Sequence, residues 1–338
     1  MRCIIPAAGK GTRLRPHTHA NPKALLQLGN KPIIAHIMNQ VIDAGITDII
    51  IIVGYEKEKL IKYITNQFSH KCKLTFLEQK DRKGLGHAIY MASEFLDEEP
   101  VLIALGDSIY EKSFAKMIQT FDKYPSWAGA LTIKEVSNPQ AYGIVITEQN
   151  SPVVDRLVEK PQAPESNKAI TGIYMIRNSI NLLKALEAIV KSDFKGAGGE
   201  IQLTDALQKM VDDGSVLGTI NSGKWFDCGK KESLLEANNF ILSKNEESEI
   251  YSKTKNNIII HPVAIQENCQ ISNSIVGPYV SIASGTTIKR SILSSSIIGN
   301  RTRIENVNLN ESIIGDEVKL VGGLSDFNIG DNSDIQFS

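Results

Sequence analysis

A glycine-rich segment near the start of the chain has the residue types of a phosphate-binding loop. It follows the apolar run Cys3–Pro6 and continues with AAGKGTRLRP, residues 7–16. Glycines let a backbone approach a ligand closely, and consecutive backbone N–H groups can bind phosphate oxygens. Arg13 and Lys23 would add fixed positive charge to such a loop. It is neither a Walker loop, which needs GxxxxGK[ST], nor a dinucleotide fingerprint, because Leu14 stands where the third glycine would be.

An acidic residue follows another apolar run. Asp107 comes directly after Val101–Gly106, which the pattern predicts as a buried strand. A carboxylate exposed at the end of a strand can hold Mg²⁺. An Asp-Ser pair after a strand is equally typical of a turn or a helix cap. The residue types alone therefore leave this metal site open.

Ordered motifs across the first 243 residues resemble the sugar-1-phosphate nucleotidylyltransferases, also called nucleotide-sugar pyrophosphorylases. The glycine-rich loop followed by Pro22-Lys23 is similar to the loop that opens those enzymes. The resemblance continues, in chain order, through Gln79 and Gly84, Gly106-Asp107, Tyr142-Gly143, Glu159-Lys160-Pro161, Thr171-Gly172, EIQLTD at 200–205 and WFDCG at 225–229. It implies transfer of a nucleotidyl group from a nucleoside triphosphate to a sugar-1-phosphate, with release of pyrophosphate.

The resemblance also implies roles for individual residues. It gives catalytic roles to Arg13, Lys23 and Lys160, with Lys160 binding the sugar phosphate. The implied nucleotide-binding residues are Ala8, Gly9, Gly11, Thr12, Gln79 and Gly84, and the implied sugar-binding residues are Gly143, Glu159, Thr171 and Gly172. Asp107 and Asp227 would be the ligands of Mg²⁺. The nucleophile in this reaction is already an anion, so catalysis should depend on positioning and charge neutralisation rather than on a general base.

The nucleotide is left as a choice between two pyrimidines. Residues 159–174 and 231–237 are most similar to glucose-1-phosphate thymidylyltransferases, whereas 84–88, 199–205 and 227–229 are more similar to glucose-1-phosphate uridylyltransferases. The two bases differ by one methyl group, which is worth only about 1–3 kcal/mol of discrimination. We expect dTTP as the favoured nucleotide and glucose-1-phosphate as the acceptor. UTP is expected close behind dTTP, because so small a difference between the bases discriminates weakly.

The pattern around these motifs alternates strands and helices. Strands are expected at Cys3–Pro6, Asp48–Val53, Leu74–Leu77 and Val101–Leu105, and helices at 33–42, Glu56–Phe68 and Ala88–Leu96. This alternation predicts a Rossmann-like α/β fold, with a mostly parallel sheet and helices on both faces. Ligands of such sheets bind at the carboxyl ends of the strands, here the loops after Pro6, Leu77 and Leu105.

The period changes after Asn257, where apolar residues recur at every sixth position. The sets are Ile259, Ile265, Ile271; Val276, Ile282, Ile288; Ile292, Ile298, Ile304; Ile314, Leu320; and Ile329, Ile335. A six-residue period predicts a three-sided parallel coil with these side chains inside, whereas a β-sandwich favours a period of two. The resemblance implies a left-handed parallel β-helix of hexapeptide repeats. We expect a catalytic domain over 1–243, a linker over 244–257 and the β-helix over 258–338.

Composition narrows the class of protein further. Lys and Arg number 37 and Asp and Glu 38, so the net charge of -1 gives no drive toward nucleic acid or anionic membranes. The 4 cysteines form no CxxC pair and fit reduced thiols. The apolar runs are too short for a signal peptide or a membrane span. We expect a cytoplasmic enzyme whose partners are its two substrates and further copies of itself, joined through the β-helix.

Two other interpretations remain open. The coil could be a second enzyme, because hexapeptide coils often belong to acyltransferases that use a histidine, and His261 lies at its start. The chain could instead be a non-catalytic assembly subunit, since relatives with this architecture exist in a translation-initiation exchange factor. The presence of the Arg, Lys and Asp set named above favours an active enzyme.

Overall fold

The computed structural model describes residues 1–19, 21–192, 196–244, 249–250 and 254–322. The chain divides into two compact units. Unit 1 comprises Met1–Leu26 and Lys31–Ala237, and unit 2 comprises Gln27–Asn30 and Asn238–Ser338. The change from one unit to the other falls within helix α7 (Lys231–Lys244). The domain limits expected from the sequence stay a prediction.

Unit 1 is built on a nine-stranded sheet in which β10-β9-β11-β6-β1-β4-β5 lie in order and β8 pairs with β11 and β12. Its strands are β1 (Arg2–Pro6), β4 (Asp48–Val53), β5 (Lys73–Glu78), β6 (Val101–Ala104), β8 (Gly129–Glu135), β9 (Gly143–Thr147), β10 (Val154–Glu159), β11 (Lys168–Ile176) and β12 (Leu217–Asn221). β1 pairs in parallel with β4 and β6, and β4 with β5, whereas β11 is antiparallel to β6, β8 and β9. The expected α/β fold is confirmed, with its parallel half formed by the strands that precede the glycine-rich and acidic loops.

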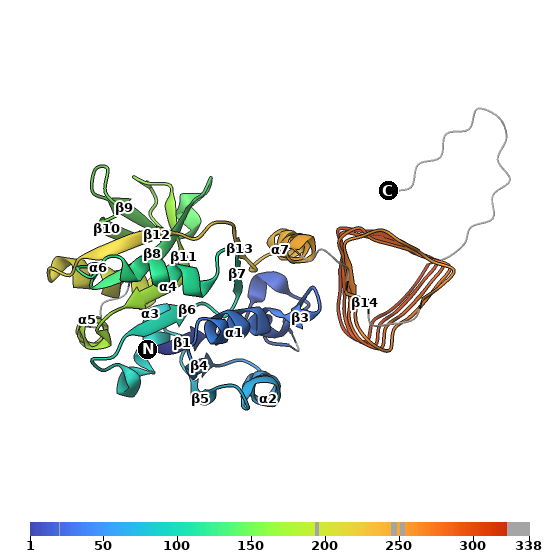
Figure 1. The fold of residues 1–338 in the computed structure, drawn as a ribbon, viewed down its shortest axis with the longest axis horizontal. Helices are drawn as coiled ribbons and strands as arrows, with labels where there is room; N and C mark the ends of the chain where they lie inside the picture. The colour runs from blue at the N-terminus through green and yellow to red at the C-terminus, as the bar shows by residue number, and fades with distance from the viewer. Residues whose placement is uncertain (20, 193–195, 245–248, 251–253, 323–338) are drawn as a thin grey trace. The chain divides into compact units, whose positions relative to one another are not determined.

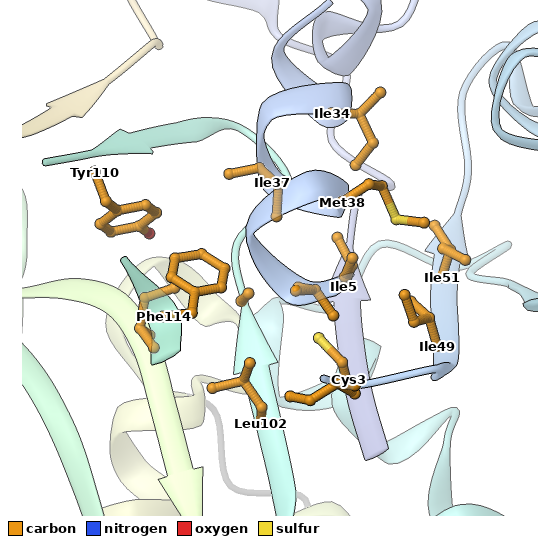
Figure 2. Packing of buried hydrophobic residues seen from close by; sticks show 14 of the residues in the cluster. Cys3, Ile5, Ile34, Ile37, Met38, Ile49, Ile51, Leu102, Tyr110 and Phe114 are labelled. Carbon is orange, nitrogen blue, oxygen red and sulfur yellow. The ribbon is translucent and has the colours of Figure 1, made fainter. Parts of the chain in front are cut away.

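Consecutive residues of a strand point to opposite faces of the sheet. Both faces of this sheet carry buried apolar side chains, and helices cover both of them. On one face, Ile5, Ile49 and Ile51 pack with side chains of α1 (Ile33–Asp43), as Figure 2 shows. The same core includes side chains of α2 (Lys57–Phe68) and α4 (Phe114–Asp122). On the other face, Ile4, Ile50 and Ile52 pack with α3 (Leu85–Tyr90), α5 (Ser179–Lys191) and α6 (Leu203–Asp212). Both layers leave the carboxyl ends of the strands to loops.

Short elements complete unit 1. Its two-stranded sheet joins β7 (Ser108–Tyr110) to β13 (Trp225–Asp227). The described residues also include β2 (Gln27–Leu28), β3 (Lys31–Pro32) and 3₁₀ turns at Thr12–Leu14, Lys23–Leu25, Ser93–Phe95, Pro139–Ala141 and Ala197–Gly199. The helix expected at Ala88–Leu96 was placed too late, since α3 begins at Leu85 and ends at Tyr90. It follows Gly84, whose φ of +105° suits glycine, and beyond it the chain tightens into a 3₁₀ turn.

Unit 2 contains a coil of parallel strands in three sheets, which Figure 1 shows as a triangular stack. The first sheet contains β14 (Glu249–Ile250), β17 (Val263–Ile265), β20 (Val280–Ile282), β23 (Ile297–Ile298) and β26 (Ile313–Ile314). The second contains β15 (Thr254–Lys255), β18 (Gln270–Ser272), β21 (Thr287–Lys289), β24 (Arg303–Glu305) and β27 (Lys319–Val321). The third contains β16 (Ile258–Ile259), β19 (Ile275–Val276), β22 (Ile292–Ser294) and β25 (Asn308–Asn310). The expected left-handed β-helix is confirmed.

One inward position of the coil was predicted wrongly. Leu293, which is fully buried, pairs with Val276 and points inward, whereas Ile292 is 44% exposed. The reason is the length of the coil turn. Three hexapeptides would need 18 residues, but this turn runs from Val276 to Leu293 and the next from Ile288 to Ile304, so corners are shortened by one or two residues. Ile329 and Ile335 lie outside the described residues.

The outer faces of the first and third sheets differ. Ser281 and Ile297 point outward from the first sheet and are nevertheless buried. Buried Asn238 bonds to this face, because its Oδ1 accepts from Ser281 Oγ at 2.6 Å and from the Gly29 N–H at 2.9 Å. On the third sheet, Ile258 is 59% exposed.

No helix among the described residues has the length and apolar content that a membrane crossing requires.

Candidate active site

The glycine-rich loop leaves β1 at Pro6 and keeps its backbone accessible. A Cβ atom added at Gly9 would meet nothing within 4 Å, so the space above this backbone is open. Gly11 has φ +62°, and a Cβ there would lie 3.0 Å from the Lys23 Cβ. The following 3₁₀ turn at Thr12–Leu14 buries its leucine and leaves the Arg13 side chain 61% exposed. The loop can therefore offer both backbone N–H groups and a guanidinium to an anion.

Four charged side chains from distant parts of the chain converge near this loop. Lys23 Nζ donates to Asp107 Oδ2 at 2.6 Å and lies 3.6 Å from Asp227 Oδ1. Arg13 Nη2 lies 3.9 Å from Asp227 Oδ2. The Lys23 side chain is only 8% exposed, whereas both carboxylates are partly exposed. The structure thus brings together the residues expected to be catalytic or metal-binding, except Lys160, which lies with the sugar-side residues below.

The pairing of two short strands places the carboxylates side by side. β13 runs antiparallel to β7, with Asp227 opposite Ser108, and the Cys228 N–H donates to the Asp107 carbonyl at 3.3 Å. A Cβ atom at Gly229 would lie 2.7 Å from Arg13 Nη2 and 3.0 Å from Asp227 Oδ1. A side chain at residue 229 would therefore require the Arg13 guanidinium or the Asp227 carboxylate to shift.

The charges in this cluster stabilise one another. Burial alone would lower the pKa of Lys23, but the attraction of Asp107 and Asp227 and the hydrogen bond to Asp107 raise it above its ordinary value. Lys23 is therefore an ammonium at neutral pH. Because both carboxylates already converge on one cation, their arrangement fits a hard metal ion as well. No third His, Cys, Asp or Glu joins them among the described residues, so phosphate oxygens and water would have to complete the coordination.

A cavity of about 680 Å³ lies on the Asp227 side of this cluster. Its lining residues are Arg13, Lys134, Glu135, Val136, Ser137, Asn138, Ala141, Tyr142, Lys160, Trp225, Phe226, Asp227, Lys230, Ser233 and Glu236. Four of these are cations, which suits a phosphorylated ligand. Tyr142 packs edge-on against Trp225, with ring centroids 5.2 Å apart. Lys134 and Lys230 lie outside the motifs and were missed in the sequence.

A second cavity, of about 450 Å³, lies on the Asp107 side. It is lined by Pro6, Ala8, Gly9, Lys10, Gln79, Arg82, Gly84, Leu85, Ala88, Leu105, Asp107 and Glu200. The loops that follow β1, β5 and β6 all contribute, so a cavity lies at the strand ends named in the sequence analysis. That a ligand binds there stays a prediction. Arg82 and Glu200 had no role assigned from the sequence.

The residues expected to bind the sugar divide into two groups. Glu159 Oε2 accepts from Thr204 Oγ1 at 2.6 Å, and Lys160 Nζ lies 3.5 Å from Glu159 Oε1. A Cβ atom at Gly143 would lie 2.7 Å from Glu159 Oε2, so the missing side chain makes room for this carboxylate rather than for open space. Thr204 lies in the recognised 200–205 motif but had no role assigned to it.

Thr171 and Gly172 form the second group and lie in the interior. Thr171 is fully buried, and its Oγ1 lies 2.6 Å from Thr132 Oγ1. Gly172 has φ +99° and packs against Leu105. Neither residue lines either cavity. Their assignment to sugar binding stays a prediction.

Comparison with known proteins identifies the family. The nucleotidyl transferase family matches residues 2–244. The "Bifunctional protein GlmU" of Methanococcus aeolicus is 35% identical over 80% of this chain and 62% of its own length. A glucose-1-phosphate thymidylyltransferase of Streptomyces antibioticus is 29% identical over 95% of this chain and 89% of its own. A UDP-glucose pyrophosphorylase solved with UDP-glucose superposes with a TM-score of 0.62 at 29% identity, covering 72% of this chain and 99% of its own.

The chain belongs to the nucleotidyl transferase family. Within that family it is an enzyme of the sugar nucleotidyltransferase kind, which confirms the resemblance found in the sequence. The chain spans 62% of the length of the Methanococcus aeolicus relative.

Proposed function

We propose that this protein transfers a nucleotidyl group from a pyrimidine nucleoside triphosphate to glucose-1-phosphate, giving a nucleotide-sugar and pyrophosphate. The observation that carries the proposal is the shared charge cluster. Asp107 lines one cavity, Asp227 and Arg13 line the other, and Lys23 lies within 4.0 Å of both carboxylates. Two anionic substrates bound in the two cavities would meet at this cluster.

The chain's own residues would then act by position and charge. The open backbone at Gly9 and the Arg13 guanidinium would bind the triphosphate, with Ala8, Gly11 and Thr12 shaping that loop. Lys160 would bind the sugar phosphate, and Glu159 would accept a hydrogen bond from a sugar hydroxyl. The attacking phosphate oxygen needs no base, so the barrier to lower is charge repulsion at the α-phosphate.

We infer that Mg²⁺ is the cofactor and that Asp107 and Asp227 hold it. Both are carboxylates, the ligands that Mg²⁺ prefers beside phosphate oxygens. A bound Mg²⁺ would neutralise charge on the transferring phosphates. Lys23 would remain beside both carboxylates as a second fixed positive charge.

For the nucleotide we propose dTTP, with UTP as the alternative. The Streptomyces antibioticus relative supports the first and the UDP-glucose pyrophosphorylase supports the second. The test is a pyrophosphate-release screen of dTTP, UTP, CTP, ATP and GTP against glucose-1-phosphate, with galactose-1-phosphate and N-acetylglucosamine-1-phosphate as other acceptors. We expect the highest kcat/KM for dTTP with glucose-1-phosphate. Turnover with purine triphosphates alone, or with none, would overturn the proposal.

We further propose that the enzyme is a homo-oligomer assembled through the β-helix. The third sheet of the coil supports this, because Ile258, Ile260 and Ile292 are 59%, 43% and 44% exposed. Ile258, Ile275 and Ile292 pair in register from turn to turn, so their side chains form one apolar column. Contiguous exposed apolar surface of this kind is typical of a protein interface.

A further inference from the structure

The amide group of Gln79 is held by two partners in the second cavity. Gln79 follows β5, lines this cavity and is only 5% exposed. Its Nε2 donates to the Gly84 carbonyl at 3.1 Å and also lies 3.1 Å from His87 Nδ1. His87 lies on α3, one turn beyond Gly84. No motif in the sequence singled out this histidine by itself.

The chemistry of these partners determines which way the amide points. A backbone carbonyl can only accept hydrogen bonds, so the atom facing Gly84 must be the amide nitrogen rather than the oxygen. That carbonyl is itself fixed, since it also accepts from the Ala88 N–H at 3.1 Å. The orientation therefore does not rest on the arbitrary choice between nitrogen and oxygen that an isolated amide allows.

The Nδ1 atom of His87 accepts a hydrogen bond from the second N–H of the Gln79 amide. Nδ1 can accept only when the ring is neutral and carries its proton on Nε2. Burial, together with the nearby Lys83, lowers the pKa of His87, and the opposing effect of Asp81 is smaller. The neutral ring that this bond needs is thus the form present at neutral pH.

Both N–H groups of the Gln79 amide are hydrogen-bonded within the protein, so Oε1 is the amide atom that is available to bind a ligand. We propose that His87 is a positioning residue that fixes the Gln79 amide with Oε1 available to the nucleobase, so that the cavity selects a base with an N–H at that edge. Uracil and thymine carry such an N–H at N3, whereas N3 of cytosine carries a lone pair. The proposal rests on the proposed function, because it takes this cavity as the base site of a pyrimidine nucleotidyltransferase.

Without the histidine, only the hydrogen bond to the Gly84 carbonyl would hold the Gln79 amide. The second N–H would lose its partner, and the amide would rotate about its last bond and present Nε2 to the base more often. The site would then accept cytosine more readily and bind uracil less well. Sites built to hydrogen-bond one group reject an analogue that cannot make the bond far more strongly than apolar pockets do. We expect loss of the His87 imidazole to reduce the preference for UTP over CTP by about tenfold or more.

The experiment compares His87→Leu with His87→Asn in the full chain. Leucine fills similar space without an acceptor, whereas asparagine keeps an amide oxygen at about the position of Nδ1. The readouts are kcat/KM for UTP, dTTP and CTP with glucose-1-phosphate, and the dissociation constants of UTP and CTP from calorimetry. We expect His87→Leu to reduce the UTP-to-CTP ratio mainly through KM and the dissociation constants, and His87→Asn to restore most of it. His70→Leu, at an exposed histidine, is the control for loss of an imidazole.

The outcomes separate this inference from the proposed function. A wild-type enzyme that prefers UTP and dTTP, with a UTP-to-CTP ratio unchanged in His87→Leu, overturns the role of His87 and leaves the function standing. A lowered melting temperature with an unchanged ratio shows a structural role only and also overturns it. A wild-type enzyme that binds CTP as well as UTP overturns the amide orientation. Absence of turnover with any pyrimidine triphosphate overturns the proposed function, and the calorimetric ratio then still decides the role of His87.

Discussion

The two units use charged side chains in opposite ways. In unit 1, Lys23 is nearly buried and bonds to carboxylates that come from residues 107 and 227, far apart in the sequence. In the described part of unit 2, charged residues pair within one strand, as Arg303 does with Glu305, or with the next turn of the coil, as Arg301 Nη2 does with Glu317 at 2.6 Å. Both members of that pair are about two-thirds exposed. Repetition gives the coil partners for its polar groups, whereas the catalytic unit gathers charges that no repeat could bring together.

This difference has energetic consequences. An exposed ion pair contributes about 0–1 kcal/mol, so the coil pairs add little to stability individually. A buried ammonium costs several kcal/mol to desolvate and is tolerated only because carboxylates surround it. Such a cluster is weak evidence for stability and stronger evidence for function. We therefore expect charge removal in unit 1 to change the rate, and equivalent changes in the coil to leave it unaltered.

The largest effect is expected from the two aspartates. Asp107→Ala and Asp227→Ala should each lower kcat by about 10³-fold, because the transferring phosphates lose the charge neutralisation that a metal would supply. The measurement is pyrophosphate release at saturating Mg²⁺. Asp107→Asn and Asp227→Asn, which keep side-chain volume, separate loss of charge from loss of folding, and circular dichroism checks the fold.

The matched control lies in the coil. Asp316 accepts hydrogen bonds from Asn300 at 2.7 and 3.0 Å, and Asp316→Ala should leave kcat within twofold, on the order expected for a surface substitution. Near-normal turnover in either Asp107→Ala or Asp227→Ala would show that this carboxylate is not a metal ligand.

A smaller effect is expected from Arg13. Arg13→Ala should lower kcat by about 10²-fold while changing substrate binding less, because its charge acts most as negative charge redistributes around the α-phosphate. Steady-state kinetics with both substrates varied would show this. Arg301→Ala is the coil counterpart and should change neither parameter. If Arg13→Ala raised only KM, the guanidinium would bind the ground state and the transition state equally.

Lys160 should show the complementary pattern. Lys160→Ala should raise the KM for sugar-1-phosphate by about tenfold, with a smaller change in kcat, because it removes one charge from a cavity that also contains Lys134 and Lys230. Initial rates over a range of glucose-1-phosphate at saturating triphosphate measure the effect. Finding that Lys160→Ala lowers kcat while Arg13→Ala raises KM would mean that the two roles are reversed.

The sequence predicted most of what depends on periodicity and little of what depends on side-chain contact. The strand after Met1 and the strand at Asp48–Val53 were found because buried strands are apolar runs of the right length. The coil followed from its six-residue period, but one shortened corner moved Ile292 to the outside. The six-residue period predicts a three-sided coil. It does not predict the number of residues at each corner, which determines which side chains point inward.

The site shows the same limit. The resemblance located the charged residues, yet it gave no sign that Gln79 bonds to His87 or that Thr204 donates to Glu159. These contacts join residues through folded geometry that no spacing encodes. Asn238 is a further example, since no sequence pattern places the Gly29 N–H within 2.9 Å of its side chain.

The smallest effect on turnover is expected at the third sheet of the coil, and it tests whether this unit serves assembly. Ser281 and Ile297, in the outward column of the first sheet, are buried, whereas on the third sheet Ile258 and Ile292 remain exposed in register with Ile275. Burying each isoleucine against another subunit would gain about 1.5–3 kcal/mol, and a lysine in its place would forbid the contact.

Ile258→Lys combined with Ile292→Lys should therefore lower the mass found by light scattering and reduce the melting temperature. The value of kcat should stay within about twofold, because the residues proposed to be catalytic all lie in unit 1. Thr287→Lys places the same charge on the second, polar sheet and should leave the mass unchanged. If the double variant kept the wild-type mass, the isoleucine column would not be the interface. If it kept the mass but lost turnover, the coil would have to act in catalysis itself, and an acetyltransferase assay on the intact protein would be the next measurement.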